Sequence, residues 1–253
     1  MEIIYNKNMN KKYNNSPITE AVCEFIFDIS NTVDNVFVDK FYDKIKEIFP
    51  DRKKGLDNKV EFKIDQKSGN DFFNKTTQKF DQFFSKDRKT FLQLKKDGRI
   101  SIHKIKPYDS WTIFSKQISI VFQSYLKLAE IKSVKRIGLR YINNFQIQEL
   151  SFKLEEYFNF RPATFGAVPS DLAGFSIGSI FAFEDKKDLA KVQILNLPSN
   201  TEKAVFMLDI DYYSGMPNTI RVDDSCAWVE KAHSHIEELF ESILTDKIKN
   251  SFN

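Results

Sequence analysis

The sequence predicts an α+β fold, with a mostly antiparallel mixed sheet in two β-rich halves and helices packed on one face. Alternating apolar and polar residues form many short runs that follow one another through short turns, which is typical of antiparallel pairing. Three stretches with helical spacing lie between these groups of strands. The 253 residues are 42% hydrophobic, which is enough to bury a core without disulfides or metal ions.

Two helices are expected in the first half of the chain. Apolar residues recur at helical spacing over residues 33–49, where Asp34 can cap the start and Pro50 can end the helix. A second amphipathic helix is expected to begin at a cap on Asp109 or Ser110. Its apolar stripe would be Trp111, Phe114, Ile118, Val121, Phe122 and Tyr125.

The strands of this half are recognised by alternation. They are expected at residues 18–29, 60–64, 79–84, 90–94 and 134–147, with a loop at 66–76. Asp97 and Gly98 stand between two alternating runs, which is a strong hairpin signal. We expect a two-residue type I′ turn there, which needs positive φ at both positions.

The second half has the expected order βββα after a short helix at residues 152–158. Prolines and a glycine mark residues 161–171 as a linker. Strands are expected at 175–183, 189–197 and 204–213. The last helix is expected to start at the cluster Asp223-Asp224-Ser225, with the apolar stripe Val229, His233, Ile236, Phe240 and Ile243.

Charge divides the chain unevenly. The net charge is −2 over residues 1–50, +12 over 51–147 and −7 over 148–253. The expected parts are a polar N-terminal arm at 1–16, a basic α+β half at 17–150 and an acidic βββα half at 151–253, the two halves packed as one compact unit. The asymmetry indicates either a polyanion-binding half or two halves that attract each other, within one chain or between subunits.

Several function classes are disfavoured by the motifs. The chain has no GxGxxG or GxxxxGK[ST] nucleotide motif. It has no run of apolar residues of membrane-helix length and no secretory leader. The two cysteines, Cys23 and Cys226, belong to no CxxC pair and fit a reducing compartment. We therefore expect a cytoplasmic protein with no cofactor and no membrane partner.

Four segments together carry a family resemblance. They are PITEAVCEF at residues 17–25, PYDSW at 107–111, RIGLRYIN at 136–143 and AHSHIEELFESILT at 232–245. With its PIxEAxxEFxF start and RIGLRYIN strand, the chain resembles a sporadically distributed prokaryotic family whose members are about as long as this chain. The resemblance implies an accessory role, of the defence or mobile-element kind, and brings no catalytic residue with it.

A basic strand face is the main candidate site. Alternate residues of a strand share a face, so Arg136, Gly138 and Arg140 point the same way, and glycine leaves a gap between the two guanidinium groups. If the strands join one sheet, the tentative anion-binding residues are Lys95, Arg99, His103, Arg136 and Arg140. Arginine can bind a phosphate or carboxylate through two parallel hydrogen bonds. The hypothesis is that this face binds RNA, DNA or a phosphorylated ligand.

An alternative reading concerns Asp209 and Asp211, which share one face of a strand. They could pair with the two arginines of the first half, which would make the basic face an internal ion-pair layer. They could also bind a divalent metal ion in a phosphoesterase or nuclease. His233 and His235, with Cys226, make a weaker metal candidate, because residues two apart on a helix point in different directions.

Aromatic residues interleave with the basic segment. Phe72-Phe73 and Phe83-Phe84 lie among lysines and arginines, a pattern that suits stacking on single-stranded bases. The alternative is that these rings pack in the core. We expect a non-enzymatic binding or adaptor protein of an accessory system. Its partner would be a nucleic acid or phosphorylated ligand, a protein from the same operon, or a second copy in a homodimer. The metal-dependent enzyme and a structural homo-oligomer remain alternatives.

Overall fold

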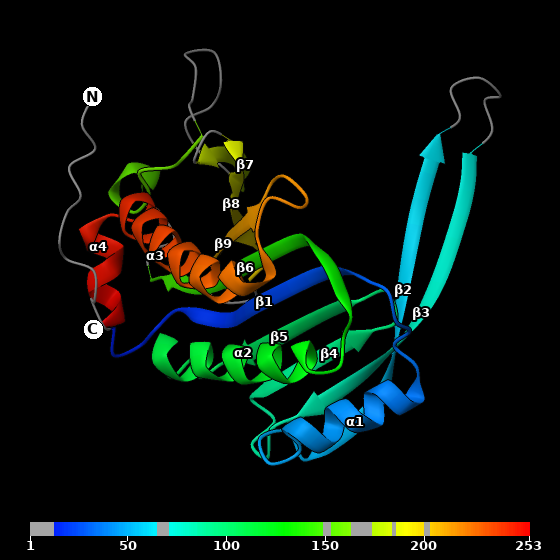
Figure 1. Cartoon of the computed structure of the whole chain (residues 1–253). Coiled ribbons are helices and arrows are strands. Elements are labelled where there is room, and N and C mark those ends of the chain that lie inside the picture. The colour runs from blue at the N-terminus through cyan, green and yellow to red at the C-terminus, as the bar shows by residue number, and fades with distance from the viewer. Residues whose placement is uncertain (1–12, 65–70, 149–152, 163–173, 184–185, 200–202) are drawn as a thin grey trace.

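The structure is a computed structural model of the chain. It describes all residues except 1–12, 65–70, 149–152, 163–173, 184–185 and 200–202, and only the backbone of residues 57–64 and 71–78. The described strands form one nine-stranded sheet in the order β2-β3-β4-β5-β1-β6-β9-β8-β7, and every pair is antiparallel (Figure 1). The α+β prediction is confirmed, and pairing of β6 with β9 joins the two halves into one sheet.

The strands have the following bounds. They are β1 (Ile18–Ile29), β2 (Asp51–Ile64), β3 (Asp71–Phe84), β4 (Thr90–Lys95), β5 (Arg99–Ile105), β6 (Ile131–Ile147), β7 (Ser176–Phe183), β8 (Asp188–Leu197) and β9 (Ala204–Ser214). The helices are α1 (Asn35–Ile45), α2 (Trp111–Leu126), α3 (Ser225–Ile243) and the short α4 (Asp246–Lys249). Residues Leu154–Glu156 form a 3₁₀ turn where a short helix is expected.

The core lies between the helices and one face of the sheet. Phe25 of β1 stacks on Phe122 of α2 with ring centroids 4.9 Å apart, and Tyr125 packs on Phe27 at 5.6 Å. In the second half Trp228 of α3 packs on Tyr212 of β9. Contacts between rings join α1 to α2, α2 to α3 and α3 to the C-terminal turn on this side of the sheet, so no described helix lies on the opposite face.

The predicted helix starts are set by local hydrogen bonds. Asp34 accepts from the Phe37 backbone N–H at 2.8 Å, and Ser110 accepts from the Ile113 N–H at 3.4 Å. These bonds satisfy backbone donors that a first helical turn leaves unpaired. Both apolar stripes face the sheet. Their buried members are Phe37, Val38, Phe41, Ile45, Phe114, Ile118, Val121, Phe122 and Tyr125.

The hairpin at residues 95–99 is confirmed, but the predicted type I′ turn is wrong. Gly98 has φ of +82°, whereas Asp97 is not among the residues with positive φ. The Gly98 N–H bonds to the Lys95 carbonyl, so the chain makes a turn over residues 95–98 and places glycine in the left-handed position after it. One residue with positive φ, instead of two, is enough to reverse the strand.

The expected strand lengths need correction. Strands β2 and β3 are both longer than predicted. Strand β2 begins at Asp51 and not at residue 60, and β3 begins at Asp71, within the segment expected to be a loop. Residues 66–70 of that expected loop lie outside the described part. Of the expected polar arm at 1–16, the described residues pack against the C-terminal region. Tyr13 donates to Glu241 at 2.6 Å and contacts the ring of Phe252. The expected linker at 161–171 lies almost entirely outside the described residues.

No helix in the described part of the chain is both long enough and apolar enough to cross a membrane.

Candidate functional site

The face of the sheet that no described helix covers carries a row of charged side chains. We call it the charged face. Its central members are Glu20, Glu24, Arg99, Ser101, His103, Arg136, Arg140, Asp209 and Asp211. Strand register brings them together from β1, β5, β6 and β9, because directly opposed residues of antiparallel strands point to the same side. Lys95 of β4 lies on the same side, opposite Phe80 of β3.

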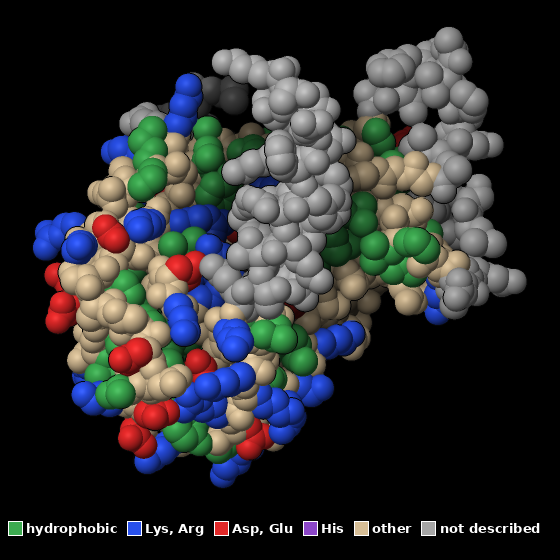
Figure 2. Space-filling view, turned by 90° about the vertical axis from the view of Figure 1, so that its right-hand side faces the viewer, with side chains coloured by type: hydrophobic (Ala, Val, Ile, Leu, Met, Phe, Trp, Pro, Cys, Tyr) green, Lys and Arg blue, Asp and Glu red, His purple; other side chains and the backbone are tan. Residues whose placement is uncertain are grey.

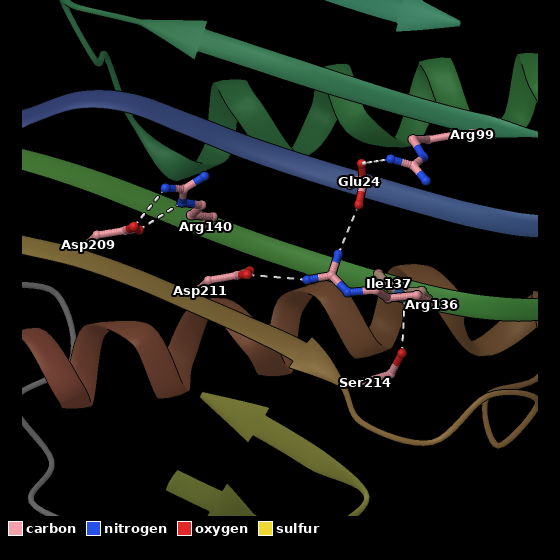
Figure 3. Close-up of polar contacts among 8 residues, drawn as sticks. All are labelled: Glu24, Arg99, Arg136, Ile137, Arg140, Asp209, Asp211 and Ser214. Atoms are coloured by element: carbon pink, nitrogen blue, oxygen red, sulfur yellow. Dashed lines mark hydrogen bonds and ion pairs between the residues drawn. The ribbon is translucent and has the colours of Figure 1, made fainter. Parts of the chain in front are cut away.

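Arg136 is held between two carboxylates. Its Nη1 donates to Glu24 at 2.9 Å and its Nη2 donates to Asp211 at 3.2 Å (Figure 3). The guanidinium also lies 4.7 Å from the ring centre of Tyr213. A Cβ atom on Gly138 would come within 2.7 Å of Nη1, so the gap predicted at this glycine is filled by the Arg136 side chain itself.

Arg140 makes a two-pronged ion pair with Asp209. Its Nε and Nη2 donate to the two carboxylate oxygens at 2.7 and 2.6 Å (Figure 3). The Asp209 side chain is only 7% exposed, whereas that of Arg140 is 44% exposed. Hydrogen bonding to Asp209 raises the pKa of Arg140. Burial raises the pKa of Asp211, although both arginines act against this shift.

The alternative in which Arg136 and Arg140 pair with acids of the second half is therefore the arrangement in the structure. Arg99 is held more loosely, with Nη1 3.8 Å from Glu24, and its Nε is buried and has no hydrogen-bond partner among the described atoms. Glu24 thus contacts two arginines at once (Figure 3).

His103 joins Ser101 and Glu20 in a hydrogen-bonded chain. His103 Nδ1 lies 2.8 Å from Glu20 and Nε2 lies 2.9 Å from the Ser101 hydroxyl. A carboxylate can only accept, so Nδ1 carries the proton toward Glu20, and in the neutral ring Nε2 accepts from serine. The bond from His103 is the main reason that the pKa of Glu20 is lowered. The imidazole is also stacked on Phe91, with centroids 4.5 Å apart.

This connectivity matches that of a serine hydrolase, but the surroundings do not. Ser101 is 6% exposed and sits in the middle of a strand that is paired on both sides. The neighbouring backbone N–H groups are used by the sheet, whereas an oxyanion hole needs donors that are aimed at the reacting carbonyl. The chain of bonds therefore orients His103 and Glu20 on the charged face and gives no acyl-transfer site.

The two carboxylates of the metal-site alternative are both engaged in ion pairs. Asp209 and Asp211 accept hydrogen bonds from Arg140 and Arg136. Among the described residues, no three His, Cys, Asp or Glu side chains come together in a metal-binding arrangement. His233 stacks on Trp111 at 4.0 Å, and His235 stacks on Tyr212 at 5.2 Å, so both histidines pack between α3 and its neighbours.

The predicted aromatic surface is divided by the strand. Phe83 is fully buried in the core. Phe84 is partly exposed on the other side, where its ring lies 5.7 Å from Phe91 and 5.5 Å from the guanidinium of Arg88. Phe72 and Phe73 lie where only the backbone is described. Phe84 therefore stays a candidate for stacking on a base, whereas the buried Phe83 does not.

Two surface cavities among the described residues lie away from the charged face. One of about 390 Å³ lies beside Lys104, whose buried ammonium pairs with Asp109 at 2.7 Å. The other, of about 370 Å³, opens near Asp188, which accepts from Trp228 at 2.9 Å and from Lys231 at 2.8 Å. In each cavity the buried charge already has a partner of opposite sign.

Sequence reasoning found the cations of the charged face and, as an alternative, their partners Asp209 and Asp211, but it missed Glu20 and Glu24. The signal that could have found them is the alternation along residues 18–29, which puts Glu20 and Glu24 on one face of a strand. No protein-family model matches the chain and no curated protein matches it. The family resemblance drawn from RIGLRYIN stays a prediction.

Proposed function

We propose that this chain is a non-enzymatic binding module, an adaptor of the accessory kind, that docks a protein partner on its charged face. The observation that carries the proposal is the ion-pair lattice on a sheet face that no described helix covers. Side chains held by ion pairs lose less freedom when a partner arrives, so the lattice presents a preordered surface.

The balance of charge favours a protein over a polyanion. The three central arginines stand among four carboxylates, those of Glu20, Glu24, Asp209 and Asp211. A nucleic acid would have to displace these carboxylates or lie against them, and like charges repel. Figure 2, which looks onto the right-hand side of Figure 1 and not onto the charged face, shows Lys and Arg side chains interspersed with Asp and Glu there as well.

The composition of the charged face also suits a protein interface. Arginine and tyrosine are enriched where binding energy concentrates, and here Arg136 stacks on Tyr213. The partly exposed side chains of Val22, Ile26 and Ile142 lie between the charges. A partner with complementary charges and a small apolar centre would match this pattern.

The test uses two isoleucine variants. In Ile142→Lys the new ammonium lies opposite Asp209 and Glu20 in the register, so the fold can accommodate it while the charged face changes. Ile113→Lys is the matched control on α2, where the isoleucine is 49% exposed. Each variant is co-expressed with the proteins encoded beside it, and co-elution is measured by size-exclusion chromatography.

We expect co-elution of one such protein with the wild type and with Ile113→Lys, and its loss with Ile142→Lys. Fluorescence anisotropy with short single- and double-stranded RNA and DNA is the second arm. The binding constant for a nucleic acid could fall linearly on a log–log plot against salt concentration, and binding could be lost with Arg136→Ala/Arg140→Ala. That result would identify the partner as a polyanion and would contradict the proposed protein partner. If neither kind of partner responds to changes on the charged face, the proposal is wrong.

A further inference from the structure

The two edges of the sheet are protected to very different degrees. The edge strand β2 has the sequence DRKKGLDNKVEFKI and carries charges along its length. The opposite edge strand, β7, has the sequence SIGSIFAF, with no charged residue and no proline. Natural proteins guard exposed edges with lysine, proline or bulges, because an open edge pairs with other strands. By this rule β2 is guarded and β7 is not.

The side chains of β7 are unusually exposed for their type. Ile180 is 60% exposed and Phe181 is 39% exposed, on opposite faces of the strand. Among the described residues, the other large apolar side chains with such exposure occur singly. On its inner side β7 pairs with β8, and no described strand pairs with its outer side (Figure 1). The outer edge therefore offers both backbone hydrogen-bonding groups and apolar surface.

We propose that β7 pairs antiparallel with β7 of a second copy, which joins two nine-stranded sheets into one. A two-fold axis perpendicular to the sheet reverses the strand direction and keeps the faces, so helices of both copies lie on one side. Directly opposed residues of an antiparallel pair point to the same face of the sheet. Under a two-fold axis this is possible only if one residue lies on the axis, opposite the same residue of the second copy. The most exposed residue, Ile180, is assigned to the axis.

The strand is complementary to itself in this register. Ile180 packs on Ile180 of the second copy, and Gly178 lies opposite Ala182. On the helix side, Ser179 lies opposite Phe181, so a small side chain leaves room for the exposed ring. An uncharged strand gives no electrostatic preference for another protein, whereas a second copy brings the same pattern in every encounter. The charged faces of both copies stay open, so the inference is independent of the proposed function.

The test compares the oligomeric state of three proteins. Sedimentation equilibrium over a wide concentration range should give a wild-type mass that rises to twice that of the chain. Ile180→Lys should stay monomeric, because a residue on the axis brings two ammonium groups opposite each other. Ile113→Lys, which places the same change on α2, should dimerise as the wild type does. A monomeric wild type, or an Ile180→Lys protein that still dimerises, overturns the proposal.

A cross-link gives a second readout that does not depend on weakening the dimer. In a Cys226→Ser background, Ile180→Cys should form a disulfide-linked dimer under mild oxidation. Cβ atoms of directly opposed residues lie about 4.5–5.5 Å apart, which is within reach of a disulfide after small adjustments. Ile113→Cys, in the same background, should remain a monomer on a non-reducing gel. Equal cross-linking of the two variants would refute the assignment of Ile180 to the axis.

Discussion

Replacing Arg140 should destabilise the protein more than replacing its partner Asp209. In Arg140→Met the methionine keeps part of the aliphatic volume, but the Asp209 carboxylate, 7% exposed, is left without its two charge-assisted hydrogen bonds. Leaving one member of a buried pair alone costs about 3–5 kcal/mol. Because Arg140 is 44% exposed, water can reach the carboxylate, and we expect a loss of about 2–3 kcal/mol.

Replacing Asp209 instead leaves the Arg140 guanidinium without its carboxylate partner. In Asp209→Asn the amide oxygen still accepts one hydrogen bond, and the half-exposed guanidinium of Arg140 can turn to solvent. The expected loss is about 1 kcal/mol, the net value of one hydrogen bond. The double variant Arg140→Met/Asp209→Asn removes both charges, leaves no buried charge alone, and should be closer to the wild type than Arg140→Met alone.

Urea unfolding followed by circular dichroism measures all four proteins at neutral pH. The double-mutant cycle then gives the coupling energy of the pair. The reasoning is refuted if both single variants cost the same, or if the coupling is below about 0.5 kcal/mol, as for an exposed surface pair. Such a result would leave Arg140 free to bind an anion, and the polyanion hypothesis would regain its strongest residue.

Three other predictions follow from local geometry. Gly98→Ala should cost about 1–2 kcal/mol in urea unfolding, because φ is +82° and a Cβ atom would lie 2.9 Å from a backbone oxygen. In His103→Phe the free energy of unfolding should fall less between neutral and acid pH than it does in the wild type. The pKa of Glu20 is lowered below 4.5, so its contribution is complete above that pH and is lost as pH falls through the lower folded value. Unfolding at pH 7 and at acid pH checks this. In thiol labelling of the native protein, Cys23 should react only after unfolding, because burial raises its pKa, whereas half-buried Cys226 should react first.

Local signals in the sequence predicted the parts of the fold that depend on local chemistry. Asp34 and Ser110 cap helices as expected, because a cap involves residues only three positions apart. The turn at Gly98 was placed correctly and given the wrong type, since both types use glycine with positive φ. The length of β3 was missed, because residues 71–76, DFFNKT, show no regular alternation of apolar and polar residues.

The candidate site could be predicted only in part. Alternation along β6 put Arg136 and Arg140 on one face, and this needed no tertiary information. Their partners come from β1 and β9, and the order of strands in the sheet brings them within reach. Pairing between distant strands is set by packing of the whole core, so Glu24 could not be assigned to Arg136 from spacing alone.

The ion-pair lattice explains why uneven charge along the chain need not mean a basic surface. The strongly basic segment contributes Arg136 and Arg140 through β6, and the acidic segment contributes Asp209 and Asp211 through the adjacent β9. Opposite charges on neighbouring strands stabilise this pairing and disfavour registers that would oppose like charges. The same lattice leaves little free positive charge at the centre of the sheet. Charge in this chain thus acts first on strand register, and the surface that remains is a face of alternating sign.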